Sequence, residues 1–394
     1  MLQLLQYLKK HEKQVIITLS CLGLLFLSLL IYYAVLLGKV SDVLLVVKSQ
    51  LSNSQIALTK LKNQDQFKRN ETLQNDIKAI EITYKDAVRT YEKIQDLKAQ
   101  KQNITDYDKE LIKSLSYLSE RNYASASSTI ASLNKKINED QTIAQSIATP
   151  KISTSSNAPP SNTLPSSGYA VQKVSTEIGE FTVGLVSADL GSIRVVVDTA
   201  SDSDCHDSCP VLSLGDYVAR NGAFAGINGT YFCPAEYPSC AGKTNSFDLL
   251  VMNKNKHYIN ADNNVYSTNP AVIFQGGSVR FVGQALQWGR DTGVDGVLSN
   301  YPLLLSGGTR VFTGDGDPKK GGKGSRSFVG SKGNTVYIGV VYNATVAEGA
   351  YALKALGLEN ALNLDSGGST ALWAGGYKAG PGRNIPNAIL FINK

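Results

Sequence analysis

The sequence predicts an α+β domain, rich in strands and poor in helices, preceded by a transmembrane helix and an α-helical coiled-coil stalk. The first observation is that 33 of the 35 glycines lie at or beyond Gly168, and none lies between Val40 and Ser167. A long stretch without glycine favours helices, and a glycine-rich half favours strands joined by turns. The second observation is an uncharged run of 23 residues, 15–37, which is long enough to cross a bilayer as a helix.

The charges beside this apolar run predict its orientation. Lys9, Lys10 and Lys13 precede it, and cations next to a span stay in the cytoplasm. We therefore expect a cytoplasmic tail at 1–14, an uncleaved signal anchor at 15–37 and an extracytoplasmic remainder, in a single-pass protein of the cell membrane. A cleavable signal peptide would need a shorter apolar core and a small-residue cleavage site, which YAVLLGKV does not offer.

Helical periodicity continues after the span and predicts a stalk at 38–147. Apolar residues alternate steps of four and three, the spacing of a heptad seam: Leu73, Ile77, Ile80, Tyr84, Ala87, Tyr91 and Ile94. Two further helical patterns meet at a polar turn around Arg121 and predict a hairpin, with Thr105 or Asp106 as a cap. A simple spacer, self-association through the seam and an assembly scaffold are the open roles of this stalk.

A segment rich in Ser, Thr and Pro, 148–168, is typical of a linker and separates the stalk from the strand-rich domain at 169–394. In that domain, β-rich runs such as SIRVVVDT and TVYIGVVY alternate with glycine turns. One helix is expected from Val346 to Leu356, because Thr345 and Glu348 have the spacing of a capping box and Gly357 suits the helix end.

The cysteines predict disulfides in the C-terminal domain. Cys21 lies inside the apolar run, which leaves an even number beyond it: Cys205, Cys209, Cys233 and Cys240. Outside the cytoplasm, CHDSC and CPAEYPSC favour two short-loop disulfides, although four cysteines permit three pairings. A four-thiolate zinc site is the alternative, and the spacings fit zinc knuckles poorly.

Several function classes find little support. Before Ala148 the chain has 20 Lys and Arg and 15 Asp and Glu, whereas after it there are 19 and 18. The strand-rich domain therefore lacks the excess of positive charge that is typical of a nucleic-acid binder. With three histidines in the chain and no GxSxG, Walker or HExxH pattern, a Ser-His-Asp hydrolase is not indicated.

One loop could collect a metal ion. Its carboxylates could bind calcium, yet they lack EF-hand spacing, so a solvated acidic loop is expected and no metal site is predicted: Asp198, Asp202, Asp204 and Asp207.

Two strand ends carry polar residues beside glycine. AGINGTYF delivers Asn228 and Gly229, and NALNLDSGGST delivers Asp365 onto a glycine turn. Glycine lets a ligand approach the backbone and leaves N–H groups free to donate, so Asp365 is a candidate for chemistry next to an anion-binding turn. A tight hairpin in which Asp365 bonds its own turn is the structural alternative.

Six motifs in order extend this observation over residues 170–394. They are AGINGTYF, NYPLLLSGGTRV, GSRSFVG, TVYIGVVY, TVAEGAYALKALGLENALNLDSGGST and GRNIPNAILF. Together they resemble the phosphodiester glycosidase family, which implies hydrolysis of a sugar joined to phosphate through its anomeric carbon. The substrate expected from the resemblance is a glycosyl phosphate. The anchor, stalk and linker lead to the hypothesis that it belongs to a cell-surface glycopolymer.

The resemblance also implies roles for individual residues. Asp365 matches the family's catalytic aspartate, and Arg326 its phosphate-clamping arginine, with Arg383 as a second clamp. Asn228 is expected to orient a hydroxyl or the carboxylate. The turn is expected to contact phosphate or sugar oxygens through Gly367, Gly368, Ser369 and Thr370.

Two residues leave alternatives open. Glu348 is either the second carboxylate of glycoside hydrolysis or only the capping-box partner of Thr345. Ser366 replaces the first glycine of the family's triple-glycine turn, and a positive φ there would strain a serine. That departure favours the alternative function, a non-catalytic module that binds surface glycans and retains the fold.

Overall fold

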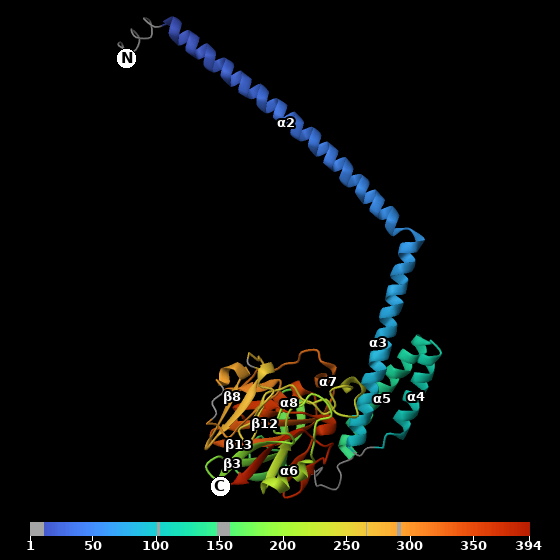
Figure 1. Ribbon diagram of the computed structural model, residues 1–394, viewed down its shortest axis with the longest axis vertical. Coiled ribbons are helices and arrows are strands. Elements are labelled where there is room, and N and C mark those ends of the chain that lie inside the picture. The colour runs from blue at the N-terminus through green and yellow to red at the C-terminus, as the bar shows by residue number, and fades with distance from the viewer. Residues whose placement is uncertain (1–11, 101–102, 148–157, 265, 290–292) are drawn as a thin grey trace. The chain divides into compact units, whose positions relative to one another are not determined.

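The computed structural model describes residues 12–100, 103–147, 158–264, 266–289 and 293–394 (Figure 1). These residues form two compact units, Met1–Ile80 and Glu81–Lys394. The tail predicted at 1–14 and the linker predicted at 148–168 lie partly outside the described residues.

The first unit is helical. Helix α2 (Glu12–Lys62) is 51 residues long, and α3 (Asp65–Ala99) follows it. Within the described residues, one helix is long and apolar enough to cross a membrane, from Ile16 to Lys62, and the span predicted at 15–37 forms its first part. A helix of this length reaches roughly 75 Å, more than twice the hydrocarbon core of a bilayer.

The second unit begins with three helices. The C-terminal half of α3 packs against α4 (Thr105–Ser119) and α5 (Tyr123–Ile147), which form the predicted hairpin. Of the proposed heptad seam, Ala87 and Ile94 are buried in this bundle, whereas Leu73 and Ile77 are exposed. The predicted side-chain cap of α4 is wrong, because Thr105 is already helical and its N–H donates to the Asn103 side chain at 3.1 Å.

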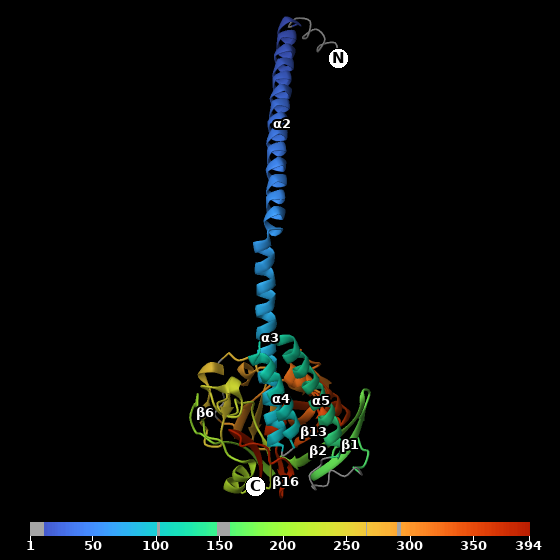
Figure 2. The ribbon, with the colours of Figure 1, turned by 90° about the vertical axis from the view of Figure 1, so that its right-hand side faces the viewer.

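Three antiparallel sheets form the strand-rich domain, as the glycine distribution predicts. The seven-stranded sheet has the order β1 (Gly168–Thr176), β2 (Gly179–Asp189), β13 (Thr335–Ala344), β12 (Gly324–Lys332), β14 (Asn360–Asn363), β10 (Leu303–Ser306) and β11 (Thr309–Arg310). Figure 2 shows its strands β1, β2 and β13 side by side.

The other two sheets have five strands each. One has the order β16 (Tyr377–Ala379), β15 (Leu372–Ala374), β4 (Ala225–Asn228), β17 (Asn387–Asn393) and β3 (Ile193–Thr199). The other has the order β6 (Tyr258–Ile259), β5 (Val251–Met252), β9 (Gly296–Ser299), β7 (Ala271–Gln275) and β8 (Ser278–Val282). Short helical turns occur at η1 (Pro238–Cys240), η2 (Asp262–Asn264), η3 (Ala285–Trp288), α7 (Pro318–Gly321) and η4 (Gly367–Ser369).

One apolar core joins all three sheets. Ile227, Val251 and Leu362, one from each sheet, belong to the same buried cluster. Helix α8 (Val346–Ala355) packs on the seven-stranded sheet, and α6 (Leu214–Asn221) packs on the sheet that contains β17. The capping box predicted for α8 is confirmed, and Gly357 has the positive φ of +81° expected at the helix end. The sheets are therefore fixed against one another near their strand ends.

Part of the predicted linker belongs to this domain. Ser161 N donates to Lys173 O at 2.9 Å, and Lys173 N donates to Pro159 O at 3.1 Å. Residues 158–163 therefore lie along the edge strand β1.

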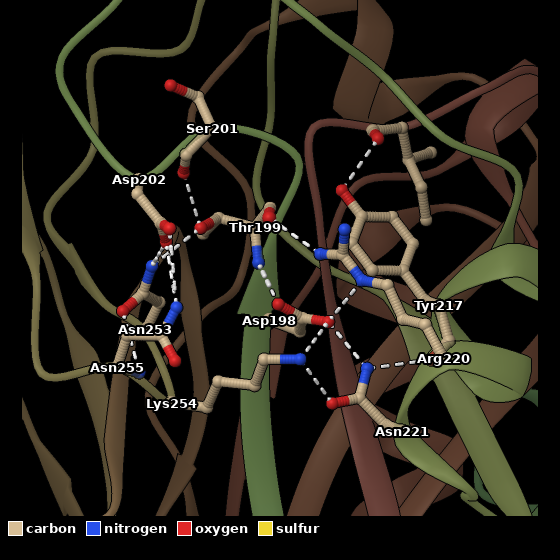
Figure 3. A network of polar contacts seen from close by, with 11 residues as sticks. Asp198, Thr199, Ser201, Asp202, Tyr217, Arg220, Asn221, Asn253, Lys254 and Asn255 are labelled. Carbon is tan, nitrogen blue, oxygen red and sulfur yellow. Dashed lines mark hydrogen bonds and ion pairs between the residues drawn. The ribbon is translucent and has the colours of Figure 1, made fainter.

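The acidic loop after β3 is more ordered than the sequence suggests. Asp198 is 2% exposed and accepts hydrogen bonds from Arg220 at 2.7 Å and Lys254 at 3.1 Å (Figure 3). The other three carboxylates of the loop accept hydrogen bonds from Asn253, Asn260 and Thr244. The carboxylates considered for calcium therefore bond to the protein itself, which corrects the expectation of a solvated loop for Asp198.

Candidate active site

The candidate site lies where two sheets meet. Asp365 follows β14 of the seven-stranded sheet, and Asn228 ends β4 of a five-stranded sheet. The Asp365 N–H donates to Gly229 O at 2.9 Å, and Asn228 Nδ2 donates to Asp365 O at 2.6 Å. These bonds fix the backbone of the aspartate to the end of the neighbouring sheet.

Four asparagines, each fully buried, connect the strand ends around Asp365: Asn228, Asn300, Asn363 and Asn387. Asn300 Nδ2 donates to Asn363 O at 2.8 Å, and Asn387 Oδ1 accepts from Thr230 N at 2.8 Å. Burying an amide is costly unless its polar atoms are paired, so these bonds favour one relative position of the strands. Asn363 Oδ1 is buried without a hydrogen-bond partner in the described residues.

Asn228 uses its amide for structure. Besides its bond to Asp365 O, its Oδ1 accepts from Ser327 Oγ at 2.9 Å and from Ala371 N at 3.1 Å. The side chain thus orients the main chain of Asp365, with its Oδ1 and one Nδ2 hydrogen bond directed at the protein itself.

The Asp365 carboxyl group is buried, with 9% of the residue exposed. Its Oδ1 accepts from Ser366 N at 2.8 Å. Burial raises the pKa of Asp365 to about 7, while hydrogen bonds from Ser369 and Ser366 and the charge of Arg383 act in the opposite direction. A carboxyl group with this pKa can accept and release a proton near neutral pH.

The glycine turn after Asp365 presents two backbone donors. Gly367 has a φ of +63°, whereas Ser366 has a φ of −141°, an extended conformation that serine adopts without strain. Within the described residues, the N–H groups of Gly367 and Gly368 have no hydrogen-bond acceptor. The N–H groups of Ser369 and Thr370 donate to carbonyls inside the turn, so the anion-binding donors are fewer than the sequence suggested.

Arg383 is the arginine whose positive charge lowers the pKa of Asp365. Its side chain is 6% exposed and its Nε is buried without a hydrogen-bond partner in the described chain. Burial opposes its charge, yet the carboxylates of Asp96 and Asp365, together with Tyr237, raise the pKa of Arg383. Its main-chain N–H donates to Gly368 O at 2.9 Å, which holds the arginine against the glycine turn.

The Arg326 guanidinium instead donates hydrogen bonds to main-chain carbonyl groups. Its Nε donates to Ala344 O at 2.9 Å and its Nη2 donates to Lys319 O at 3.1 Å and also to Gly322 O. These bonds attach the loop containing α7 to β12. Between the two arginines proposed as phosphate clamps, the geometry therefore favours Arg383.

Glu348 lies in the capping box of α8. Its Oε2 accepts from Thr345 N at 2.7 Å, and Lys323 Nζ lies 3.4 Å from its Oε1. The described contacts of Glu348 include none with Asp365 or the glycine turn. They correspond to the capping alternative considered from the sequence.

Sequence reasoning missed two tyrosines. Tyr231 accepts a hydrogen bond from Asn363 at 2.6 Å, and burial and the charge of Asp365 raise its pKa. The Arg383 guanidinium lies over the Tyr237 ring, with Arg383 Cζ 5.0 Å from the centroid of that ring. Tyr237 belongs to the loop closed by the Cys233–Cys240 disulfide, and the second disulfide joins Cys205 to Cys209, so the short-loop pairing is confirmed.

No group of three or more His, Cys, Asp or Glu side chains suited to a metal ion occurs in the described residues.

Comparison with known proteins gives one family match. Residues 221–392 match the family model described as Phosphodiester glycosidase. This part of the C-terminal domain is therefore similar to the phosphodiester glycosidase family. The matched residues include Asp365, Arg383 and the glycine turn. A search of curated proteins found no match to the chain.

Solved structures that match part of the chain include a hypothetical protein from Synechocystis, at 14% identity and a TM-score of 0.41 over 57% of this chain. The chain spans 62% of that protein's length. The catalytic domain of zebrafish N-acetylglucosamine-1-phosphodiester alpha-N-acetylglucosaminidase, auto-inhibited by its pro-peptide, is 15% identical, with a TM-score of 0.43 over 60% of this chain and 87% of that one.

Proposed function

We propose that the chain is a membrane-anchored extracytoplasmic hydrolase that cleaves the glycosidic bond of sugar-1-phosphate diesters. The observation that carries this proposal is the position of Asp365. Its buried carboxyl group lies at the start of a turn that is bonded to Arg383 and offers two N–H donors without an acceptor among the described residues. The match of residues 221–392 to the phosphodiester glycosidase family supports the same chemistry.

The proposed reaction breaks the bond between the anomeric carbon and the phosphate oxygen. The electron pair of that bond leaves with the phosphate, which is already a stable anion and needs little protonation. Arg383 and the N–H groups of Gly367 and Gly368 bind the departing phosphate, since guanidinium and preorganised backbone donors suit oxyanions. Asp365 stabilises the positive anomeric carbon, either as nucleophile or as the base that takes a proton from the attacking water.

The proposed location follows from the N-terminal helix and the disulfides. An apolar helix near the N-terminus and two disulfides in the C-terminal domain fit a single-pass protein with an extracytoplasmic domain. A domain tethered there would reach glycosyl phosphates of a surface glycopolymer.

The alternative of a non-catalytic glycan-binding module rested on Ser366. Because the positive φ falls on Gly367 and not on Ser366, the serine does not distort the turn. We therefore favour the hydrolase.

The test is hydrolysis of a panel of nitrophenyl sugar-phosphate diesters by the full chain. Asp365→Asn should reduce turnover at least about 1,000-fold, since it removes the group that stabilises the transition state. Asp262→Asn, which changes an exposed carboxylate of the same domain, should turn over as the wild type does. Glycan binding without turnover in the wild type would support the binding module instead.

A further inference from the structure

Two acidic side chains of α3 face the candidate site. Glu92 and Asp96 are four residues apart and therefore lie on one face of the helix. Glu92 is 3% exposed, accepts from Ser239 Oγ and lies 3.2 Å from Lys319 Nζ. Asp96 accepts from Tyr237 Oη at 2.7 Å and from the Arg383 guanidinium.

The Asp96 carboxylate lies over the glycine turn. A Cβ added to Gly368 would lie 2.8 Å from Asp96 Oδ1, and one added to Gly367 would lie 3.3 Å from Oδ2. The carboxylate thus occupies the space beside the two free N–H donors and against the proposed phosphate clamp. Burial raises the pKa of Asp96, whereas Arg383 and the hydrogen bond from Tyr237 act in the opposite direction. When ionised, the carboxylate carries the same single negative charge as a phosphodiester.

The bundle holds Asp96 in this position. On the opposite side of α3, Ile94 and Leu97 are fully buried against α4 and α5. Lys93 Nζ donates to Asn134 Oδ1 at 3.0 Å and Asn134 Nδ2 donates to Thr90 Oγ1 at 2.7 Å, which ties α3 to α5. Displacing Asp96 therefore requires either a rotamer change or movement of a packed helix.

We propose that Asp96 is an internal competitor for the phosphate subsite, so that α3 inhibits the site until a substrate anion displaces its carboxylate. The identity of that substrate rests on the function proposed above. The competition itself does not, because any oxyanion that binds Arg383 and the glycine turn must displace Asp96.

The experiment uses the full chain and inorganic phosphate as probe. Phosphate affinity is measured by isothermal titration calorimetry, and diester turnover is measured in parallel. Asp96→Asn should bind phosphate at least tenfold more tightly than the wild type and should hydrolyse the diester at least tenfold faster at subsaturating substrate. Asp96→Glu, which keeps the charge, should stay within threefold of the wild type.

Asp86→Asn is the matched control. Asp86 lies on the same helix and is paired with Arg89 at 3.2 Å, outside the contacts of the site. Its phosphate affinity and turnover should equal those of the wild type, and thermal unfolding shows whether each variant is folded. Glu92→Gln loosens the same face of α3 without touching the glycine turn and should raise both quantities by a smaller factor.

The outcomes separate the two proposals. Tighter phosphate binding in Asp96→Asn without turnover in any variant would support the competition and contradict the hydrolase. Turnover with unchanged phosphate affinity in Asp96→Asn would overturn the competition alone. A loss of turnover in Asp96→Asn as large as in Asp365→Asn would also overturn it, because Asp96 would then be a catalytic carboxylate.

Discussion

At the scale of single residues, Asp365 combines a buried position with a proton affinity suited to neutral pH. An aspartate in an unfolded chain titrates near 3.9, whereas burial raises the pKa of Asp365 to about 7. The folded chain therefore binds the proton more tightly, and the stability from this group is fully present below about pH 4 and lost as pH rises through about 7.

Asp365→Asn should remove this pH dependence. We expect the wild type to lose on the order of 4 kcal/mol of unfolding free energy from this group between pH 4 and pH 8, and the variant to lose little of it. Urea unfolding of the isolated full chain across this range measures the difference. Parallel stability curves for the two proteins would contradict the assigned pKa.

Asn228 makes a second prediction at this scale. Asn228→Ala leaves Asp365 O, Ser327 Oγ and Ala371 N without their buried partner. We expect a loss of about 3 kcal/mol in unfolding free energy and a larger fall in kcat than rise in KM, because the carboxylate loses its position. Asn393→Ala, at the exposed end of β17, is the control and should change neither the unfolding free energy nor kcat. If Asn228→Ala lowers stability but leaves kcat unchanged, Asn228 does not position the carboxylate.

The sequence predicted residues whose role is local. Asp365 and its glycine turn could be recognised because a strand, a carboxylate and glycines are adjacent. The bonds of Asn228 to Asp365 and of Arg383 to Asp96 join residues 137 and 287 positions apart, and no local pattern signals such pairs. The sequence left open whether Ser366 has a positive φ; the positive φ lies at Gly367, since the conformation of a turn depends on its tertiary contacts.

At the scale of elements, the end of β3 is fixed by a buried ion pair. Asp198 joins β3 to α6 through Arg220 and Asn221, and to the segment after β5 through Lys254 (Figure 3). Removing this buried carboxylate takes the ionic partner from both Arg220 and Lys254, although each keeps a neutral hydrogen-bond acceptor.

Asp198→Ala should therefore lower the unfolding free energy by about 3 kcal/mol. Asp202→Ala is the comparison in the same loop, because the Asp202 side chain is 56% exposed and its loss should cost less than about 1 kcal/mol. Chemical denaturation of both variants measures the two values. Equal effects would show that burial does not distinguish these carboxylates.

Elements with local signals were predicted well. The capping box and C-terminal glycine specified α8, and alternating β-rich runs specified the strands. The pairing of those strands into three sheets could not be predicted, because β2 pairs with β13 and β3 pairs with β17 across most of the domain. Such partners are selected by the shared core.

At the scale of the whole molecule, the N-terminal helix predicts membrane attachment. Leu27 and Leu30 lie at the centre and in the second half of the predicted span, and a charged residue at mid-span costs about 2.5 to 3.5 kcal/mol. The double variant Leu27→Arg, Leu30→Arg should move the full chain out of carbonate-resistant membranes. The double variant Leu58→Arg, Leu61→Arg, on the same helix beyond the predicted span, should remain attached.

Composition predicted the order of the helical and strand-rich parts, since glycine content differs so sharply between them. The second use of α3 was not visible in the sequence. Its heptad pattern explains the apolar face that packs on the hairpin. The contacts of its acidic face, Glu92 and Asp96, with Arg383 and the loop closed by Cys233 and Cys240 could be recognised only in the folded structure.

The most direct test of the proposed chemistry is hydrolysis of a sugar-1-phosphate diester in ¹⁸O-labelled water, with mass analysis of both products. Cleavage at the anomeric carbon, supported by Asp365, predicts that the label enters the sugar and that the released phosphate monoester stays unlabelled. Label in the phosphate would show attack at phosphorus and would contradict a glycosidase.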